Sequence, residues 1–149
     1  MSQFLATALV LHVVLGLIAL GAIHHTFMQV IRKQPPWGIV VAAAWTALLG
    51  FLLSWMTGAY YYVVHYGVAV KPRIVSGEFP WAHKIFMEAK EHVFLLIPFL
   101  AVVALFAVYA LREVENPALK SAASAIIATT LVLGVLVAAA GVIVSGGVR

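Results

Sequence analysis

The feature that most constrains this chain is the length of its apolar segments. From Val93 to Leu111 the sequence runs for about 19 residues without a charged side chain. A helix needs roughly 20 predominantly apolar residues to cross the hydrocarbon core of a bilayer, and such a helix satisfies its backbone hydrogen bonds internally. Other long apolar segments precede and follow this one. The pattern therefore predicts a chain built from membrane-spanning helices.

The composition supports the same interpretation. Of the 149 residues, 64% are hydrophobic and only 9% are charged, whereas a soluble domain is about half apolar and about a quarter charged. We therefore expect an integral membrane protein that contacts the lipid bilayer, located in a bacterial inner membrane. The formal net charge of +4 is spread over short loops, so the chain lacks the basic patch that a nucleic-acid partner requires.

The chain contains no cysteine. This excludes disulfides, iron–sulfur clusters, thiolate zinc sites and covalently attached c-type haem. The remaining strong metal-ligand candidates are six histidines, four methionines and five acidic residues.

Prolines and charged residues divide the chain into four predicted helices. The segment Arg32–Pro36 ends the first helix, because its two prolines lack N–H donors, and Asn116-Pro117 is typical of a helix start. We predict a loop over residues 71–80 and a kink at Pro98. The predicted helices cover approximately residues 4–31, 37–68, 80–112 and 117–144. The predicted fold class is all-α: an integral membrane four-helix up-down bundle that forms a single domain over residues 1–149.

Ionisable side chains are concentrated between Trp81 and His92, directly before the apolar run. Charges so close to a membrane span are costly and are kept mainly where they pair, bind or react. At about 1.5 Å per residue, counted from the end with the Pro35-Pro36 turn, both His12 and His92 lie about 30 Å along their helices. Gly58 lies at about the same depth on the second helix, where it leaves room for a flat ligand or a close helix.

Neutral imidazole is the usual axial ligand of b-type haem and a frequent ligand of copper and zinc. A bis-histidine haem requires two imidazoles on facing helices at one depth, with an apolar slot between them. We therefore predict His12 and His92 as axial ligands of haem b, with Gly58 and Gly16 giving room for the macrocycle. The simpler alternative is that both histidines hydrogen-bond to helix carbonyls or line a hydrated interface.

His65 and His83 form a second level, roughly 12 to 14 Å further out. They are candidates for a second haem, a metal site or the edge of a quinone pocket; the alternative is a pair of solvated histidines. Glu88 lies four residues before His92 and shares its helix face. We predict that Glu88 and Lys90 contact haem propionates or relay protons, with a solvated, salt-bridged turn as the alternative.

Three parts of the sequence carry a family resemblance: the string from Leu11 to Gly21, the dipeptide Thr57-Gly58, and the stretch from Trp81 to Lys90. Together they resemble small four-helix membrane proteins that include the HemJ-type protoporphyrinogen oxidases and the CopD-like copper-resistance proteins. In the HemJ-type branch a first-helix histidine and a third-helix lysine matter, and haem b is bound. The resemblance implies these roles for His12 and Lys90. The other histidines depart from that pattern, so the resemblance implies fold and haem binding but not the oxidase activity.

The predicted function is that of a membrane b-type cytochrome with one haem or two, carrying electrons between a membrane quinol or other donor and a redox partner protein. Two alternatives remain open. One is a copper- or zinc-handling membrane protein that uses His65, His83 and His92. The other is a small structural subunit of a larger respiratory or photosynthetic complex, or of a homo-oligomer. Its docking face would be the small residues at 138–141 and 145–147. We expect an electron-transfer protein or subunit rather than a stand-alone enzyme.

Overall fold

The computed structural model describes residues 2–148, and every regular element within them is helical. The four long helices are α1 (Gln3–Val30), α2 (Trp37–Tyr61), α4 (Glu88–Glu113) and α5 (Pro117–Gly146). Three shorter elements lie between α2 and α4: η1 (Tyr62–Val70) and η2 (Ala82–Met87), which have wider π-type turns, and the α-helix α3 (Lys71–Ser76). Four continuous helical stretches are long and apolar enough to cross a membrane, as predicted.

Helix boundaries follow the local sequence at most positions. The Ser2 side chain accepts a hydrogen bond from the Leu5 N–H at the start of α1, and the Asn116 side chain caps α5 in the same way. Pro117 lies in the first turn of α5, where its missing N–H is not required. The connection between α4 and α5 therefore ends where Asn116-Pro117 predicted it.

The segment predicted as a loop over residues 71–80 is largely helical. The second long helix continues through η1 and α3 to Ser76, beyond the predicted end near residue 68, and the third begins at Ala82. Pro72 does not end the helix because it lies in the first turn of α3, where proline is tolerated. The helix ends instead at Gly77, whose backbone is extended.

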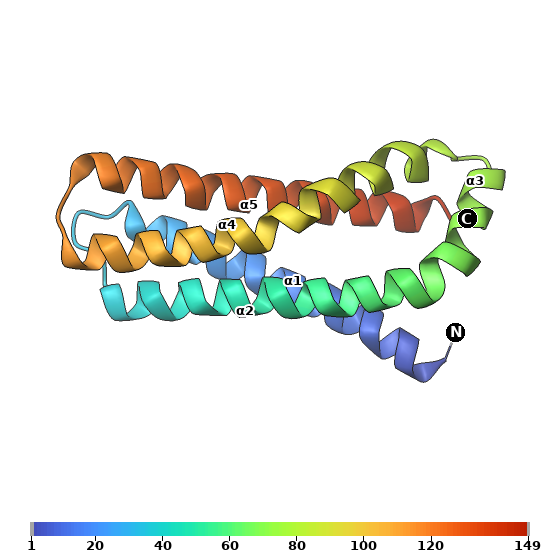
Figure 1. Ribbon diagram of the computed structural model, residues 1–149, viewed down its shortest axis with the longest axis horizontal. Coiled ribbons are helices and arrows are strands. Elements are labelled where there is room, and N and C mark those ends of the chain that lie inside the picture. Colours follow the sequence, from blue (N-terminus) through green and yellow to red (C-terminus); the bar gives the residue numbers. More distant parts are fainter. Residues whose placement is uncertain (1, 149) are drawn as a thin grey trace.

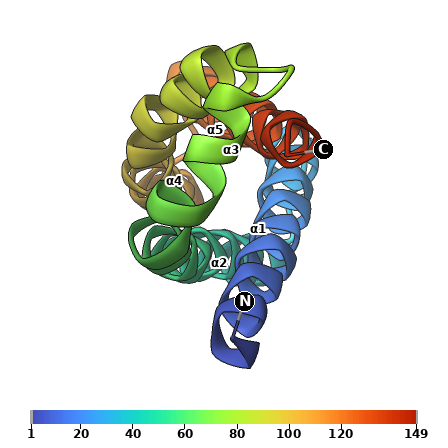
Figure 2. The same ribbon diagram turned by 90° about the vertical axis from the view of Figure 1, so that its right-hand side faces the viewer.

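The long helices are arranged as a ring in which α1 contacts α2, α2 contacts α4, α4 contacts α5, and α5 returns to α1. Figure 2 shows this ring along the bundle, with α3 crossing its near end. Both chain termini lie at this α3 end in Figure 1, and the two short connections lie at the opposite end. In the same view α4 changes direction in its yellow section, the part of the chain that contains Pro98.

The bundle has two buried clusters with an open level between them. The larger cluster lies toward the short connections, where α1 and α2 approach closely: a Cβ added at Gly50 would lie 2.9 Å from the Ala19 Cβ. The smaller cluster lies at the α3 end and consists of Tyr66, Ile74, Ala82, Met87 and Val144. The space between the clusters contains the cavities described below.

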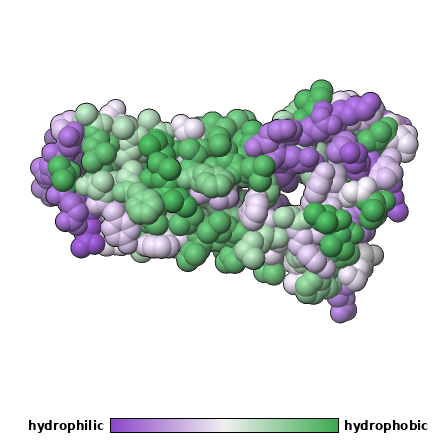
Figure 3. Space-filling view, viewed as in Figure 1, coloured by the Kyte–Doolittle hydropathy of each residue, from purple (hydrophilic) through white to green (hydrophobic). Residues whose placement is uncertain are grey.

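The outward surface of the long helices is strongly apolar, as Figure 3 shows in green. Large side chains such as Leu17, Phe99 and Phe106 are at least 60% exposed. Exposed apolar area on this scale is unusual for a soluble monomer but suits helices that contact lipid. Hydrophilic residues gather at both ends of the molecule and along a band on its upper side in Figure 3.

Candidate functional site

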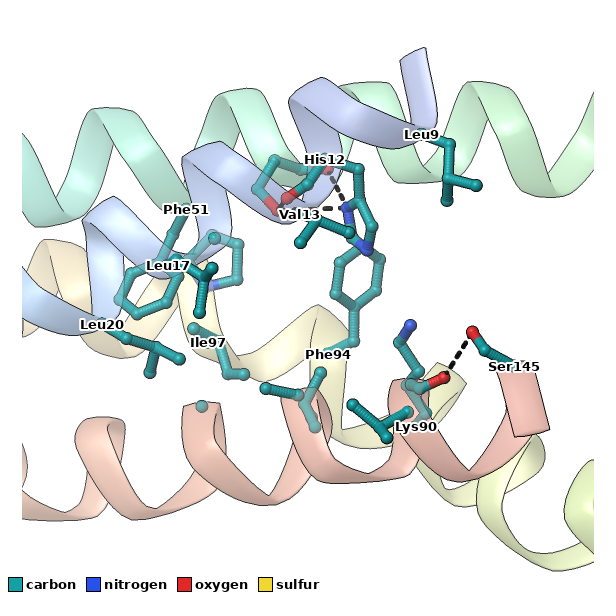
Figure 4. Close-up of a pocket in the computed structure, with 18 of the residues that line it drawn as sticks. Leu9, His12, Val13, Leu17, Leu20, Phe51, Lys90, Phe94, Ile97 and Ser145 are labelled. Carbon is teal, nitrogen blue, oxygen red and sulfur yellow. Dashed lines mark hydrogen bonds between the residues drawn. The ribbon is translucent and has the colours of Figure 1, made fainter. Parts of the chain in front are cut away.

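A cavity of about 630 Å³ lies between the four long helices, at the level between the two buried clusters. Its volume falls in the range of about 300–1,000 Å³ that is typical of sites for small molecules and cofactors. Most of its wall is apolar, and four polar side chains reach it: His12, Ser54, Lys90 and Ser145. Figure 4 shows His12 and Lys90 pointing toward one another from opposite sides of this space.

His12 is held by the second helix. Its Nδ1 atom lies 2.8 Å from the backbone carbonyl oxygen of Ser54 and 3.1 Å from the Ser54 hydroxyl. The Ser54 hydroxyl in turn donates to the His12 carbonyl oxygen at 2.8 Å. Because a carbonyl oxygen can only accept, Nδ1 carries the hydrogen, and Nε2 of the neutral ring has a free lone pair. Metal-binding histidines usually donate their other ring N–H in this manner.

Gly58 and Gly16 make room for this arrangement. A Cβ at Gly58 would lie 2.5 Å from His12 Nδ1 and 2.7 Å from its Cε1, so a side chain there would displace the ring. A Cβ at Gly16 would lie 3.2 Å from the Ser54 hydroxyl oxygen. The two glycines were predicted to leave space for a macrocycle. In the structure Gly16 lines the larger cavity, and the two glycines also leave room for the Ser54 hydroxyl and the His12 imidazole.

Lys90 reaches the same cavity from α4. Its amine lies 3.3 Å from the position of a Cβ on Gly141, so the glycine of α5 leaves the space that this amine occupies. Among residues 2–148 the one ion pair joins Arg112 to Glu113, at the other end of α4, so no carboxylate of the described chain pairs with Lys90. A cation in a largely apolar cavity without a partner is unfavourable, and it favours an anionic ligand group.

A second cavity of about 200 Å³ lies between α2 and α4. It shares His12, Lys90 and Phe94 with the larger cavity, so these three side chains separate the two spaces. Glu91 and Tyr62 add further polar groups to its wall. His12 and Lys90 therefore face two adjoining cavities.

His92 does not meet His12. It is exposed on α4, its Nδ1 lies 2.7 Å from the Glu88 carbonyl of its own helix, and it lines neither cavity. The level predicted for the site on α4 was correct to within two residues, because Lys90, two residues before His92, does face His12. Two residues correspond to about 200° around a helix, so His92 points away from the cavity that Lys90 enters. The structure thus brings together His12 and Lys90, and not His12 and His92.

The other predicted site residues also lie outside both cavities. His83 is buried at the α3 end with its Nδ1 3.0 Å from the Tyr66 hydroxyl, and His65 is half-buried with its ring 5.5 Å from that of Tyr61. Glu88 is exposed. No group of three or more histidines, aspartates or glutamates that could hold a metal ion occurs within residues 2–148. The copper or zinc alternative therefore gains no support.

Two parts of the site were missed by the sequence analysis. Ser54 lies four residues before Gly58 and so shares its helix face, which is a recognisable signal for a partner of His12. The structural-subunit alternative assigned small residues of α5 to a docking face, and three of them, Ala138, Gly141 and Ser145, line the larger cavity together with Gly134. Their spacing of four, three and four residues marks one helix face, but it does not say whether that face points inward or outward.

No family model matches the chain, and comparisons with curated proteins and with solved structures give no match either. The chemistry of the site has to follow from its own residues. They form a largely apolar cavity with one oriented imidazole and one amine that no carboxylate of residues 2–148 neutralises.

Proposed function

We propose that this chain crosses a bacterial inner membrane four times as an up-down bundle and binds one haem b in the larger cavity. In this proposal it acts as a membrane b-type cytochrome that carries electrons between a membrane-soluble donor and a partner protein. The observation that carries the proposal is the orientation of His12. Its Nδ1 is bonded to the Ser54 carbonyl, which leaves Nε2 free toward the cavity.

The residues present fit such a group. Neutral imidazole is the usual protein ligand of b-type haem, and a second hydrogen bond that fixes the ring is its normal support. Gly58 leaves the space that the imidazole needs. The cavity of about 630 Å³ has a largely apolar wall that includes Phe51, Phe94 and Ile97. When bound, haem would supply a one-electron redox couple, and the protein would determine its position and surroundings.

Each polar residue has a distinct role in the proposal. His12 would hold the haem iron through Nε2, and the Ser54 carbonyl keeps the ring from turning. Lys90 provides a positive charge for the acidic side chains of the porphyrin, because ion pairs with carboxylates are strongest where water is excluded. His92 has no role here, since it faces away from the cavity. This is the main change from the pair of histidines predicted from sequence.

The proposal is tested by the absorption spectrum and haem content of protein purified from haem-replete cells. We expect a b-type spectrum and about one haem per chain for the wild type, and loss of haem in His12→Ala. His92→Ala is the matched control. It also removes an imidazole at about this depth, but from the face of α4 that points away from the cavity. A folded, colourless wild-type protein, or equal haem loss in both variants, would contradict the proposal.

A further inference from the structure

The smaller cavity between α2 and α4 contains a carboxylate oxygen that has no partner. Glu91 lines this cavity with the Tyr62 hydroxyl beside its carboxylate group, and its Oε1 atom is buried without a hydrogen-bond partner among residues 2–148. No cation of the described chain forms an ion pair with Glu91 either. A buried carboxylate oxygen is unfavourable unless a donor is supplied, so the position calls for a ligand that carries an O–H or N–H group.

The remaining walls suit a flat ring. Trp55 and Phe94 pack against each other with ring centroids 6.2 Å apart and together form one aromatic wall. Met87 and the ring of Tyr62 add further apolar surface. Benzene fits an engineered cavity of about 150 Å³, so about 200 Å³ holds one substituted six-membered ring but no macrocycle. The smaller cavity is therefore too small for the haem proposed for the larger cavity, and its ligand must be a different molecule.

The cavity opens sideways to the apolar surface. Two of its lining residues, Val63 and Leu95, are 74% and 54% exposed on the outward faces of η1 and α4. Figure 3 shows the molecule hollowed at this place, between the α2 side and the α4 side and beside the hydrophilic band. A ligand with a ring inside and an apolar tail outside would reach the cavity from the bilayer.

Donor and acceptor groups lie next to each other in the wall. Lys90 and Glu91 are consecutive, so their side chains leave α4 about 100° apart, yet both line this cavity. A ring with oxygens at both ends can donate a hydroxyl to Glu91 and offer its other oxygen to Lys90. A ring that carries only carbonyl oxygens cannot satisfy Glu91 while that carboxylate is ionised.

We propose that the cavity between α2 and α4 binds the headgroup of a membrane quinol, one hydroxyl of which donates a hydrogen bond to Glu91 Oε1. The aromatic ring packs against the wall formed by Trp55 and Phe94, and the isoprenoid tail leaves between Val63 and Leu95. Binding of the quinol does not depend on haem; its use as an electron donor rests on the proposed function.

The test is saturable binding of decyl-ubiquinol, kept reduced, to the purified full-length chain in nanodiscs, measured by equilibrium dialysis. We expect Glu91→Gln to weaken binding about tenfold or more, because a hydrogen bond to a charged acceptor is roughly twice as strong as a neutral one. Glu88→Gln is the matched control: it lies one turn earlier on the exposed face of α4 and outside the cavity. We expect it to bind as the wild type does.

A ligand change keeps the proposal testable if Glu91→Gln does not fold. The dimethyl ether of the same quinol lacks both hydroxyls, so we expect the wild-type chain to bind it at least tenfold more weakly. Equal binding of quinol and ether, equal binding to wild type and Glu91→Gln, or no saturable binding to folded wild type would each overturn the inference. Haem content is measured on the same samples. Haem without quinol binding removes this inference alone, and quinol binding without haem removes the proposed function alone.

Discussion

Gly58 of α2 packs against the imidazole of His12, since a hypothetical Cβ on this glycine would lie only 2.5 Å from Nδ1. No side chain fits there without moving the ring away from the Ser54 carbonyl. The glycine therefore links the sequence of α2 to the direction in which His12 Nε2 points.

Replacement of Gly58 by alanine should displace His12. We expect Gly58→Ala to lose most of its haem and to melt at a lower temperature than the wild type. The control is Gly38→Ala, at a position on α2 where a Cβ meets no atom within 4 Å. This change should leave haem content intact and stabilise the helix by about 0.5–1 kcal/mol, since alanine is the better helix former. Haem retention in Gly58→Ala would show that the cavity does not depend on this ring orientation.

Replacement of Ser54 by alanine should have a smaller effect. The strongest partner of His12 Nδ1 is the backbone carbonyl of residue 54, which a substitution keeps. The lost hydroxyl donates to the His12 carbonyl, and one such bond contributes about 0.5–1.5 kcal/mol. We expect Ser54→Ala to keep its haem with a modestly lower melting temperature. Complete haem loss would mean that the hydroxyl, and not the carbonyl, holds the ring.

The helices and the depth of the site could be predicted from sequence, but the faces of α4 could not. All sides of a membrane helix are apolar, so hydropathy does not distinguish the lipid face from the bundle interior. Side-chain size does distinguish these two faces, because small residues are enriched where membrane helices pack together. The buried stripe that contains Ala101, Ala104 and Val108 continues back through Ile97 to Lys90, whereas His92 belongs to the exposed stripe of Phe99 and Phe106. A small-residue criterion would have favoured Lys90 over His92.

The α3 end was harder to predict for a different reason. The sequence predicted a loop over residues 71–80, a segment that contains Pro72 and Gly77. In the structure the wide turns of η1 lead directly into α3, whose first turn accepts the proline. No local pattern in residues 62–70 announces π-type turns. In the structure Tyr66 of this segment is buried together with Ala82, Met87 and Val144. Tyr66 and Ile74, which are buried in that packing, therefore could not be assigned to the smaller cluster.

Replacement of Lys90 should change two measured quantities in opposite directions: the melting temperature of the haem-free protein and the retention of haem. Its amine lies in an apolar cavity without a carboxylate partner in the described part of the chain, which is unfavourable in the haem-free protein. We expect Lys90→Met to raise the melting temperature of haem-free protein and to reduce haem retention, because the charge that binds the porphyrin carboxylates is lost. Lys90→Arg should retain more haem than Lys90→Met.

Lys84→Met is the control for this pair of measurements. Lys84 is exposed and lies outside both cavities, so neither the melting temperature nor the haem content should change appreciably. If Lys90→Met lowered the stability of the haem-free protein, the amine would have to be paired inside the cavity, and its proposed role toward an anionic group would fail.

The hydrogen bond between Tyr66 and His83 should stabilise the α3 end of the bundle. Both residues are 3% exposed, and the Tyr66 hydroxyl lies 3.0 Å from His83 Nδ1. Tyr66→Phe leaves a buried imidazole nitrogen without a partner, which costs about 1–3 kcal/mol. Because this end borders the smaller cavity through Tyr62, stacked on Tyr66 with ring centroids 5.2 Å apart, the substitution should also loosen that cavity.

A double-mutant cycle separates the hydrogen bond from packing. We expect Tyr66→Phe with His83→Phe to be less destabilised than the sum of the single variants, because the double variant leaves no unpaired polar atom. Tyr60→Phe serves as the control, since Tyr60 is 40% exposed and is not part of the buried cluster. Denaturant unfolding in detergent, followed by circular dichroism, measures all four proteins of the cycle and the control. Additive single effects would show that the two side chains contribute by packing alone, and the hydrogen bond would then not be what holds α3 across the end of the bundle.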